Sequence, residues 1–417
     1  MAVSHPLINT IKSLKGNQRT LVLLEPMWGI PYNLYIPYAT IYMYSLGIKD
    51  TEIGIIASVG MVFQILFSLL GGVITDKLGR RLTTLIFDMI SWAVPSIILA
   101  FSHNFVHFII AAALNAMIRI PMNSWTGLLA EDARKDQIVS IFTLIYIFAL
   151  GAAFFSPLSG LLVNRFGVVP TMRGLYLFMA LSLIIKVLIG YFGTKETTVG
   201  LVRMKEMKHH SILYGLGQYG DVFKHILKSP ATLSTLGLMF IMNVVGVING
   251  TFWGLYSSEA IGISKEYIAM FPFIKSVVML ISFFMILPRV HTDNFRKPMF
   301  FGFSLFAVSQ VTLLAVPPNG FYLLALSIVI EAVALSLISP LLDSMQIIMV
   351  EPKERSRIIS LMYVMVIALS SPFGWIAGML SSIDRRLPFV LILGMLTFGF
   401  FLTWMAKQPK KEVEPVL

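Results

Sequence analysis

The chain has 417 residues, of which 57% are hydrophobic and 13% charged, and its mean hydropathy is +0.81. This composition excludes a water-soluble globular protein, because soluble domains carry about 25% charged residues. The absence of cysteine excludes disulfides and thiolate chemistry, and the net charge of +11 is scattered between apolar runs rather than gathered into a basic domain for nucleic acid.

Twelve segments are apolar enough and long enough to cross a bilayer, whose hydrocarbon core requires about 20 apolar residues in a helix. These predicted spans are residues 21–46, 53–74, 82–101, 105–129, 138–163, 174–193, 232–257, 267–287, 298–316, 321–350, 357–380 and 388–406. The sequence therefore predicts an all-α membrane protein with twelve transmembrane helices.

Lys and Arg are unevenly distributed between the two sides of the predicted membrane. The segments on the side that holds both ends of the chain carry 23 of them, whereas the segments on the opposite side carry 6. Because basic loops are retained in the cytoplasm, we expect both termini to be cytoplasmic, in a multi-pass protein of the plasma membrane or bacterial inner membrane. We expect a monomer that contacts membrane lipid and no nucleic acid.

A polar and basic stretch separates six predicted spans from six others. It divides the chain into a cytoplasmic N-terminal segment (1–19), a six-helix bundle (20–193), a cytoplasmic linker (194–231), a second six-helix bundle (232–406) and a cytoplasmic tail (407–417). The two halves also repeat, since Gly47-Ile48 and Ser156-Pro157 recur 215 residues later as Gly262-Ile263 and Ser371-Pro372. Such a parallel repeat is typical of transporters that bind their solute between the halves.

The segment between the second and third spans reads GGVITDKLGRR from Gly71. It resembles the cytoplasmic loop signature Gly-x-Leu-x-Asp-Arg-x-Gly-Arg-Lys of the major facilitator superfamily, whose positions hold Gly72, Ile74, Asp76, Lys77, Gly79, Arg80 and Arg81. A partial copy in the second half keeps Asp293, Arg296 and Lys297. The resemblance implies the fold of that family, two pseudo-symmetric six-helix bundles, and a conformational latch at Gly72, Asp76, Gly79, Arg80 and Arg81.

Elementary chemistry is consistent with this latch. Gly72 permits the close approach of a second helix, Gly79 permits a tight reversal of the chain, and Asp76 can pair with Arg80 one helical turn away.

Small residues also recur every four positions in two other spans, which predicts closely packed helix faces at Ala152, Ser156 and Gly160 and at Ser370, Gly374 and Gly378. The first of these is a degraded form of the Gly-Pro motif of antiporters in the resembled family, which argues against efflux.

Seven ionisable side chains fall inside predicted spans, and each costs several kcal/mol at the bilayer centre unless it is paired or hydrated. They are Glu25, Asp88, Arg119, Lys186, Lys275, Glu331 and Asp343. Lys275 and Glu331 share one depth in the membrane, which predicts a buried pair. We expect Lys186 to extend to the membrane interface and Asp88 to pair with the arginines of the 72–81 loop.

Arg119 is the leading candidate for binding an anionic solute, because no acid of the first half lies at its depth. Spans 1, 4, 7 and 10 line the central cavity of the resembled family. On those spans, polar and aromatic residues at helical spacing extend the predicted substrate site to Asn115, Asn123, Trp28, Tyr32, Asn249, Trp253 and Asp343. For proton coupling we expect Glu25, Asp343 and Glu331, because a carboxylate in a partly dry cavity can alternate between protonated and ionised forms.

These observations predict a secondary active transporter that moves a small organic solute by alternating access, with protons as the coupling ion. Proton-driven efflux of amphipathic compounds or drugs is the alternative within this class. From other classes, a non-transporting membrane sensor or a lipid-modifying membrane enzyme remains open, although no acid, base or metal constellation for an enzyme is visible. We expect no cofactor and no metal, since no phosphate-binding loop occurs and His103 and His107 lack an evident third ligand.

Overall fold

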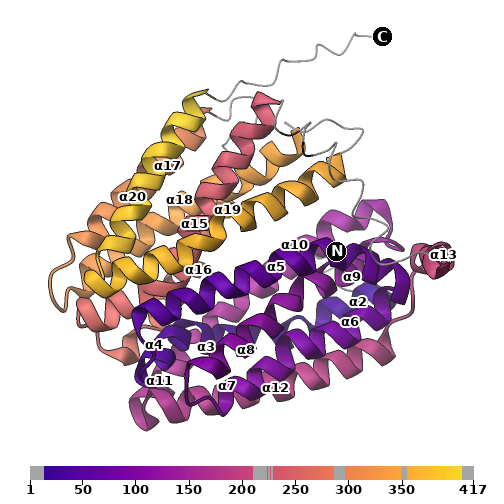
Figure 1. Cartoon of the computed structure of the whole chain (residues 1–417), viewed down its shortest axis with the longest axis horizontal. Coiled ribbons are helices and arrows are strands. Elements are labelled where there is room, and N and C mark those ends of the chain that lie inside the picture. Colours follow the sequence, from indigo (N-terminus) through magenta and orange to yellow (C-terminus); the bar gives the residue numbers. More distant parts are fainter. Residues whose placement is uncertain are drawn as a thin grey trace, which may run out of the picture.

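The computed structural model describes residues 14–209, 223, 226, 229–285, 296–348 and 355–405. Asp293 of the partial second copy of the loop lies outside the described residues. Within these ranges the regular structure is helical, and the helices form two groups that follow the two halves of the sequence (Figure 1).

The helices of the first half account for six membrane crossings. They are α2 (Gly16–Leu24), α3 (Pro26–Tyr35) and α4 (Ala39–Ser45) in span 1; α5 (Asp50–Leu78) in span 2; α6 (Arg80–Asp88) and α7 (Val94–Ala100) in span 3; α8 (Phe105–Asn115) and α9 (Arg119–Ala130) in span 4; α10 (Lys135–Ala152) and α11 (Ser156–Phe166) in span 5; and α12 (Val168–Gly193) in span 6. The first span is divided because Pro26 and Pro37 cannot donate backbone hydrogen bonds.

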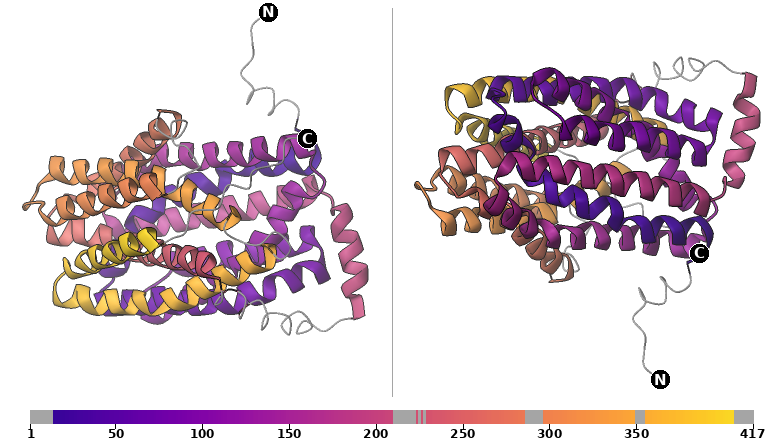
Figure 2. Two further views of the ribbon diagram at one scale, coloured as in Figure 1. Left: turned by 90° about the horizontal axis from the view of Figure 1, so that it is seen from above. Right: turned by 90° about the horizontal axis from the view of Figure 1, so that it is seen from below.

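The second half follows the short helix α13 (Thr198–Glu206), which crosses the ends of the spans (Figure 2). Its spans are α15 (Pro230–Leu255), α16 (Met270–Met285), α17 (Arg296–Leu314), α18 (Phe321–Ile348), α19 (Arg355–Ile383) and α20 (Leu387–Met405). Eleven spans in the described part are long and apolar enough to cross a membrane, and the run from Gly16 to Ser45 is the twelfth. The twelve predicted helices are confirmed, with ends shifted by a few residues.

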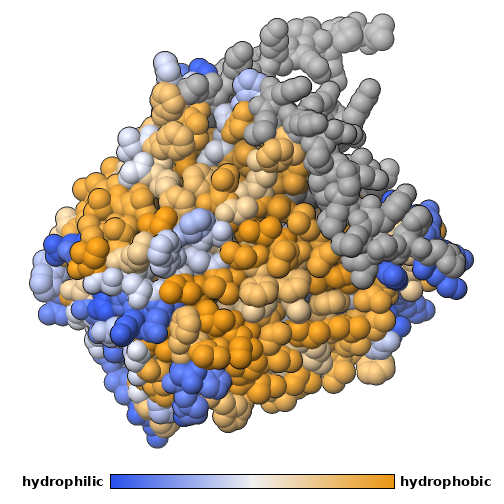
Figure 3. Space-filling model, in the orientation of Figure 1, coloured by the Kyte–Doolittle hydropathy of each residue, from blue (hydrophilic) through white to orange (hydrophobic). Residues whose placement is uncertain are grey.

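Hydrophobic side chains cover most of the face seen in Figure 3, and hydrophilic residues gather at its two ends. A belt of this kind fits a protein whose solvent is lipid along its sides and water at its ends. We name the two ends by their residues. The Asp50 end holds Asp50 and Arg385, and the linker end holds α13.

The two halves are joined near the Asp50 end. Asp50 accepts hydrogen bonds from Ser381 Oγ at 2.6 Å and from Arg385 Nε at 3.1 Å. Burial alone would lower the pKa of Arg385, but its bonds to Asp50 and Tyr44 raise it, so the guanidinium stays charged. Deeper in the seam, Tyr38 Oη donates to the Lys265 carbonyl at 2.7 Å.

Two of the predicted small-residue faces form this seam. A Cβ atom on Gly54 of α5 would collide with the Gly374 carbonyl oxygen and lie 2.9 Å from Gly378 Cα of α19. On span 5, Ser156 Oγ donates to the Ala269 carbonyl at 2.6 Å. The close approach expected at these helix faces is therefore present, and it joins one half to the other.

Replacing Gly54 by Ala tests this seam. The added methyl group has no room between α5 and α19, and overpacking of this kind costs about 1–3 kcal/mol, so we expect a lower Tm in thermal unfolding of the purified protein. Gly394→Ala is the matched control, since a Cβ atom there meets nothing within 4 Å. Equal Tm values for the two variants would contradict the packing described here.

Candidate functional site

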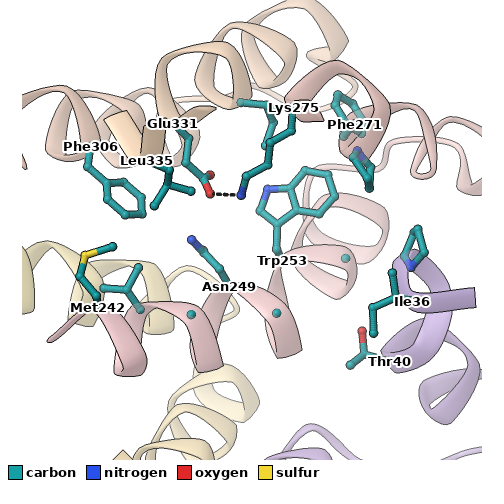
Figure 4. Close-up of a pocket in the computed structure, with 17 residues that line it drawn as sticks. Ile36, Thr40, Met242, Asn249, Trp253, Phe271, Lys275, Phe306, Glu331 and Leu335 are labelled. Atoms are coloured by element: carbon teal, nitrogen blue, oxygen red, sulfur yellow. Dashed lines mark hydrogen bonds and ion pairs between the residues drawn. The ribbon is translucent and has the colours of Figure 1, made fainter. Parts of the chain in front are cut away.

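A cavity of about 380 Å³ lies where span 1 meets the second half (Figure 4). The first half contributes Ile36, Pro37 and Thr40, and the remaining lining comes from α15, α16, α17 and α18. Gly246, Gly250 and Gly254 of α15 leave the space open, because a Cβ atom on either of the first two would meet no other atom within 4 Å. The cavity is large enough for a small organic solute.

An ion pair lies in the wall of this cavity. Lys275 Nζ of α16 is 2.7 Å from Glu331 Oε1 of α18, with side-chain exposures of 32% and 5% (Figure 4). The shared depth that the sequence predicted for these two residues is thus confirmed as a contact. The carboxylate is buried against the apolar wall, whereas part of the ammonium faces the cavity.

Asn249 and Trp253 of α15 point toward the same pair (Figure 4). Within the described part of the chain, Asn249 Oδ1 and Trp253 Nε1 are buried and have no hydrogen-bond partner. A buried polar group without a partner costs about 1–3 kcal/mol, which a polar group of a bound solute can offset. The rest of the wall is largely apolar, with Phe271 and Phe306 among its residues.

The aromatic residues predicted on span 1 lie elsewhere. Trp28 stacks on Tyr32 with ring centroids 4.8 Å apart, and both rings meet the edge of Trp92 in span 3. Neither residue lines the cavity. On span 1 the cavity instead meets Ile36 and Thr40, one to three turns further along the chain.

Arg119 also lies outside this cavity. Its Nε and Nη2 atoms donate to Gln64 Oε1 at 2.9 and 2.7 Å. No ion pair of Arg119 occurs among the described residues. Its Nη1 atom lies 4.0 Å from Met122 Sδ, so the partners of this half-buried guanidinium are neutral and leave it capacity for an anion.

The other polar residues predicted near Arg119 have separate surroundings. Asn115 Nδ2 donates to the Ser91 carbonyl at 2.8 Å, which ties span 4 to span 3. The side chain of Asn123 is exposed, and the exposed Asp343 accepts from Gln346 Nε2 at 3.3 Å. Span 4 therefore contributes no lining to the cavity, and spans 8 and 9 contribute instead.

The residues predicted to act as a latch lie in an ionic cluster at the linker end. Arg80 Nη1 lies 2.9 Å from Asp76 Oδ1, as expected, and Arg80 Nη2 lies 2.9 Å from Glu131 Oε1. Glu196 accepts the backbone N–H groups of Arg80 and Arg81 at 2.9 and 3.0 Å. Sequence reasoning missed Glu131 and Glu196, because only the folded chain brings them to the loop.

The two glycines of this loop differ. Gly79 has a φ of +84°, and a Cβ atom there would lie 2.6 Å from Glu196 Oε2, so the predicted tight reversal is confirmed. The close helix approach predicted at Gly72 is wrong, since a Cβ atom on it would meet nothing within 4 Å. Gly71 has that role instead, because its added Cβ atom would lie 3.0 Å from the Arg119 carbonyl oxygen.

The sequence suggested that Lys186 extends to the membrane interface, and this prediction is wrong. Lys186 is 8% exposed, and its Nζ lies 3.5 Å from Glu25 Oε2 of span 1, which gives the ammonium a buried partner. The pairing predicted for Asp88 is also wrong. Arg80 is held by two other acids, and Arg81 Nε donates to the Tyr191 carbonyl at 2.8 Å.

Comparisons with known proteins agree with this architecture. The sequence model of the family described as Major Facilitator Superfamily matches residues 28–293. Quinolone resistance protein NorA of Staphylococcus aureus is 29% identical over 105 residues, and the match covers 25% of this chain and 27% of that relative.

Two solved structures are similar in fold. The crystal structure of the nucleoside transporter NupG has a TM-score of 0.71 at 16% identity and covers 94% of this chain and 100% of its own. A POT family transporter in complex with 5-aminolevulinic acid has a TM-score of 0.69 at 16% identity and covers 95% and 98%. At these identities the similarity shows the fold alone.

The pair in the cavity predicts an asymmetric loss of stability. Removing one partner of a fully buried pair costs about 3–5 kcal/mol. We expect Lys275→Met to lower Tm more than Glu331→Gln, because it leaves the more buried group without a partner, and the double variant to recover part of the loss.

The exposed pair of Arg203 and Glu206, 2.9 Å apart with side-chain exposures of 54% each, is the control for this series. Its single variants Arg203→Met and Glu206→Gln should change stability by about 0–1 kcal/mol. Thermal unfolding of all variants gives the comparison. Additive losses in the Lys275 and Glu331 double variant would show that the two groups do not interact.

Proposed function

Because the chain belongs to the Major Facilitator Superfamily and is a secondary transporter, we propose that its solute binds in the cavity around Lys275 and Glu331. The observation that carries this proposal is a buried ion pair in the wall of an apolar cavity between the halves. Alternating access around a site between two repeats would then carry the solute across the membrane.

The donors around the cavity favour a carboxylate on an otherwise apolar solute. Lys275 Nζ, the Asn249 amide and Trp253 Nε1 face the same space, and Glu331 is the one carboxylate among the lining residues (Figure 4). Aromatic and aliphatic walls suit the remainder of such a solute. Arg119, with its neutral partner Gln64, provides a second position for the anion.

Glu331 is the proposed point of proton coupling at this cavity. When its carboxylate takes up a proton, Lys275 loses its counter-charge and becomes available to the carboxylate of the solute. Proton and solute therefore favour each other's binding, which is the requirement for symport. The exposed Asp343 stays a candidate for proton transfer toward the linker end.

The orientation is part of the proposal. The uneven distribution of Lys and Arg in the sequence supports an orientation in which the linker end and both termini lie in the cytoplasm. The seam at the Asp50 end would then close the extracellular side, and the structure would be inward-facing. We further propose a monomer in the plasma membrane or bacterial inner membrane, without enzymatic activity of its own.

Efflux of amphipathic compounds is a second candidate. The sequence similarity to a quinolone resistance protein favours it, as does the largely apolar cavity wall. A lipophilic cation would bind by replacing Lys275 beside Glu331. The two candidates therefore differ in the sign of charge that the solute carries.

Transport in proteoliposomes separates these candidates. We expect an inwardly directed proton gradient to drive accumulation of an aromatic carboxylate from a panel that includes benzoate and indole-3-acetate. Glu331→Gln should lose this accumulation but keep exchange of labelled for unlabelled solute, because glutamine imitates the protonated acid. Asp384→Asn, which removes an exposed acid, is the control.

Either of two outcomes would contradict the carboxylate proposal. Gradient-driven accumulation that persists in Glu331→Gln would show that Glu331 does not carry the coupling proton. Transport of ethidium, a lipophilic cation, without transport of any carboxylate would establish the efflux candidate.

Arg119→Gln tests the second anion position. Loss of hydrogen bonds to a charged group costs about 1.5–3 kcal/mol, which corresponds to roughly 10-fold to 100-fold weaker binding. We expect this loss in the Kd of the transported carboxylate, measured by quenching of tryptophan fluorescence. Arg386→Gln at the Asp50 end is the control, and an unchanged Kd in Arg119→Gln would place Arg119 outside the path of the solute.

A further inference from the structure

Three ionisable side chains from three spans meet behind span 1, outside the central cavity. Glu25 lies at the junction of α2 and α3, Lys186 on α12, and Asp88 at the end of α6. Lys186 Nζ is 3.5 Å from Glu25 Oε2, and their side chains are 10% and 9% exposed. None of the three lines the central cavity, so its solute does not account for them.

Asp88 and Lys186 line a second, small cavity of about 20 Å³. A volume of this size holds about one water molecule. Trp125 lines it as well, and its Nε1 atom is buried without a hydrogen-bond partner among the described residues. A donor without an acceptor beside a carboxylate indicates a place for a water molecule.

Arg81 and Tyr191 are the other charged or titratable groups that line this cavity. The guanidinium of Arg81 lies 3.9 Å from the centre of the Tyr191 ring, and its Nε donates to the Tyr191 carbonyl at 2.8 Å. These partners are neutral, but the Arg81 side chain is partly exposed, so water screens its charge from the buried carboxyl groups. The cluster itself therefore consists of two carboxyl groups and one ammonium. With both carboxyl groups ionised it has one uncompensated negative charge.

An uncompensated charge is costly in a low-dielectric interior, and a carboxyl group there removes it by binding a proton. One proton makes the cluster neutral, with one ionised carboxylate facing the ammonium and one neutral carboxylic acid. We propose that Glu25, Asp88 and Lys186 form a proton-binding site, separate from the central cavity, that holds one exchangeable proton.

The site adjoins the places where its spans depart from regular helix. Glu25 precedes Pro26, where α2 ends and α3 begins. In the first turn of α3, the carbonyl of Met27 accepts a hydrogen bond from Ser182 Oγ of α12 at 2.6 Å. Asp88 precedes the π-helical turn Met89–Ala93 in span 3. Such turns are frequent at functional sites.

Span 1 also connects this site to the central cavity. The same span continues from Glu25 through α3 to Ile36 and Thr40, which line that cavity. A change of charge at Glu25 therefore acts on the bend of a helix that contacts the solute. The role of this proton in transport rests on the proposed function, whereas its binding does not.

Infrared difference spectroscopy between alkaline and acidic buffer tests the site in reconstituted protein without any solute. The carbonyl band of a protonated carboxylic acid is distinct from the bands of ionised carboxylates. We expect one such band from the cluster, and we expect Asp88→Asn and Glu25→Gln each to remove it, because either change leaves one carboxylate with one ammonium.

Lys186→Met should have the opposite effect. Without the ammonium, both carboxyl groups bind protons, so the band should roughly double, and its midpoint should move up by about 1–3 pH units. Glu331→Gln and Asp343→Asn are controls that should leave the cluster's band in place. Because Lys186→Met adds a signal, it also distinguishes the proposal from loss caused by misfolding.

A band that is unchanged in Asp88→Asn and Glu25→Gln, together with an unmoved midpoint in Lys186→Met, would overturn the proposal and leave a fixed structural ion cluster. That result would not affect the central cavity, whose role is tested by solute transport in Glu331→Gln. Conversely, failure of transport would leave the proton site standing as measured.

Discussion

The cost of placing charge in a bilayer is the constraint on which the interior of this protein depends. An ionised group at membrane depth must have a partner or water, and the described spans meet this requirement in three ways. Lys275 and Glu331 pair across two helices in the wall of the cavity. Lys186 pairs with Glu25 behind span 1 and lines a small cavity with Asp88, and Arg119 has a neutral amide as its partner.

These arrangements differ in what they leave available. The Lys275 and Glu331 pair is neutral as a whole, so a proton or a solute has to separate it before either partner can act. The cluster at Glu25 has one acid too many for its ammonium, and Arg119 has no counter-charge among the described residues. In the proposals made above, these three arrangements receive a solute, a proton and an anion, respectively.

The seam at the Asp50 end is a close contact between the two halves. Glycines bring the backbones of α5 and α19 together, and Asp50 adds hydrogen bonds to Ser381 and Arg385. Asp50 and Ser381 are only 6% and 4% exposed, so separating the halves at this end would require water or another partner for the Asp50 carboxylate. A joint of this kind can hold the halves together in one state and release them in another.

Much of the fold followed from the sequence, because the length and composition of a span are local properties. The spans, the small-residue faces and the depth shared by Lys275 and Glu331 were all predictable in this way. Depth alone did not reveal the partner of Lys186, since Glu25 comes from a distant span. Helical spacing placed Trp28 and Tyr32 on one face of span 1. It does not show which helix that face meets, and the face meets Trp92 of span 3 rather than the cavity.

The cavity itself shows the same limit. Asn249 and Trp253 were identified from span 7, but the hollow beside them depends on Gly246 and Gly250, and a glycine repeat within an apolar run is as often a packing face. Contacts between distant loops, such as that of Glu196 with the backbone of Arg80 and Arg81, leave no mark in local sequence.

The most direct test of the account measures whether the solute moves the two halves. The chain contains no cysteine, so spin labels can be attached at Phe101→Cys and Tyr322→Cys, two exposed positions at the Asp50 end, one in each half. The distance between the labels is then measured by electron paramagnetic resonance with and without a saturating transported carboxylate in acidic buffer. The account predicts a new population at longer distance when the carboxylate is present. An unchanged distribution, with binding demonstrated in the same sample, would contradict alternating access and favour a protein that senses its solute without carrying it.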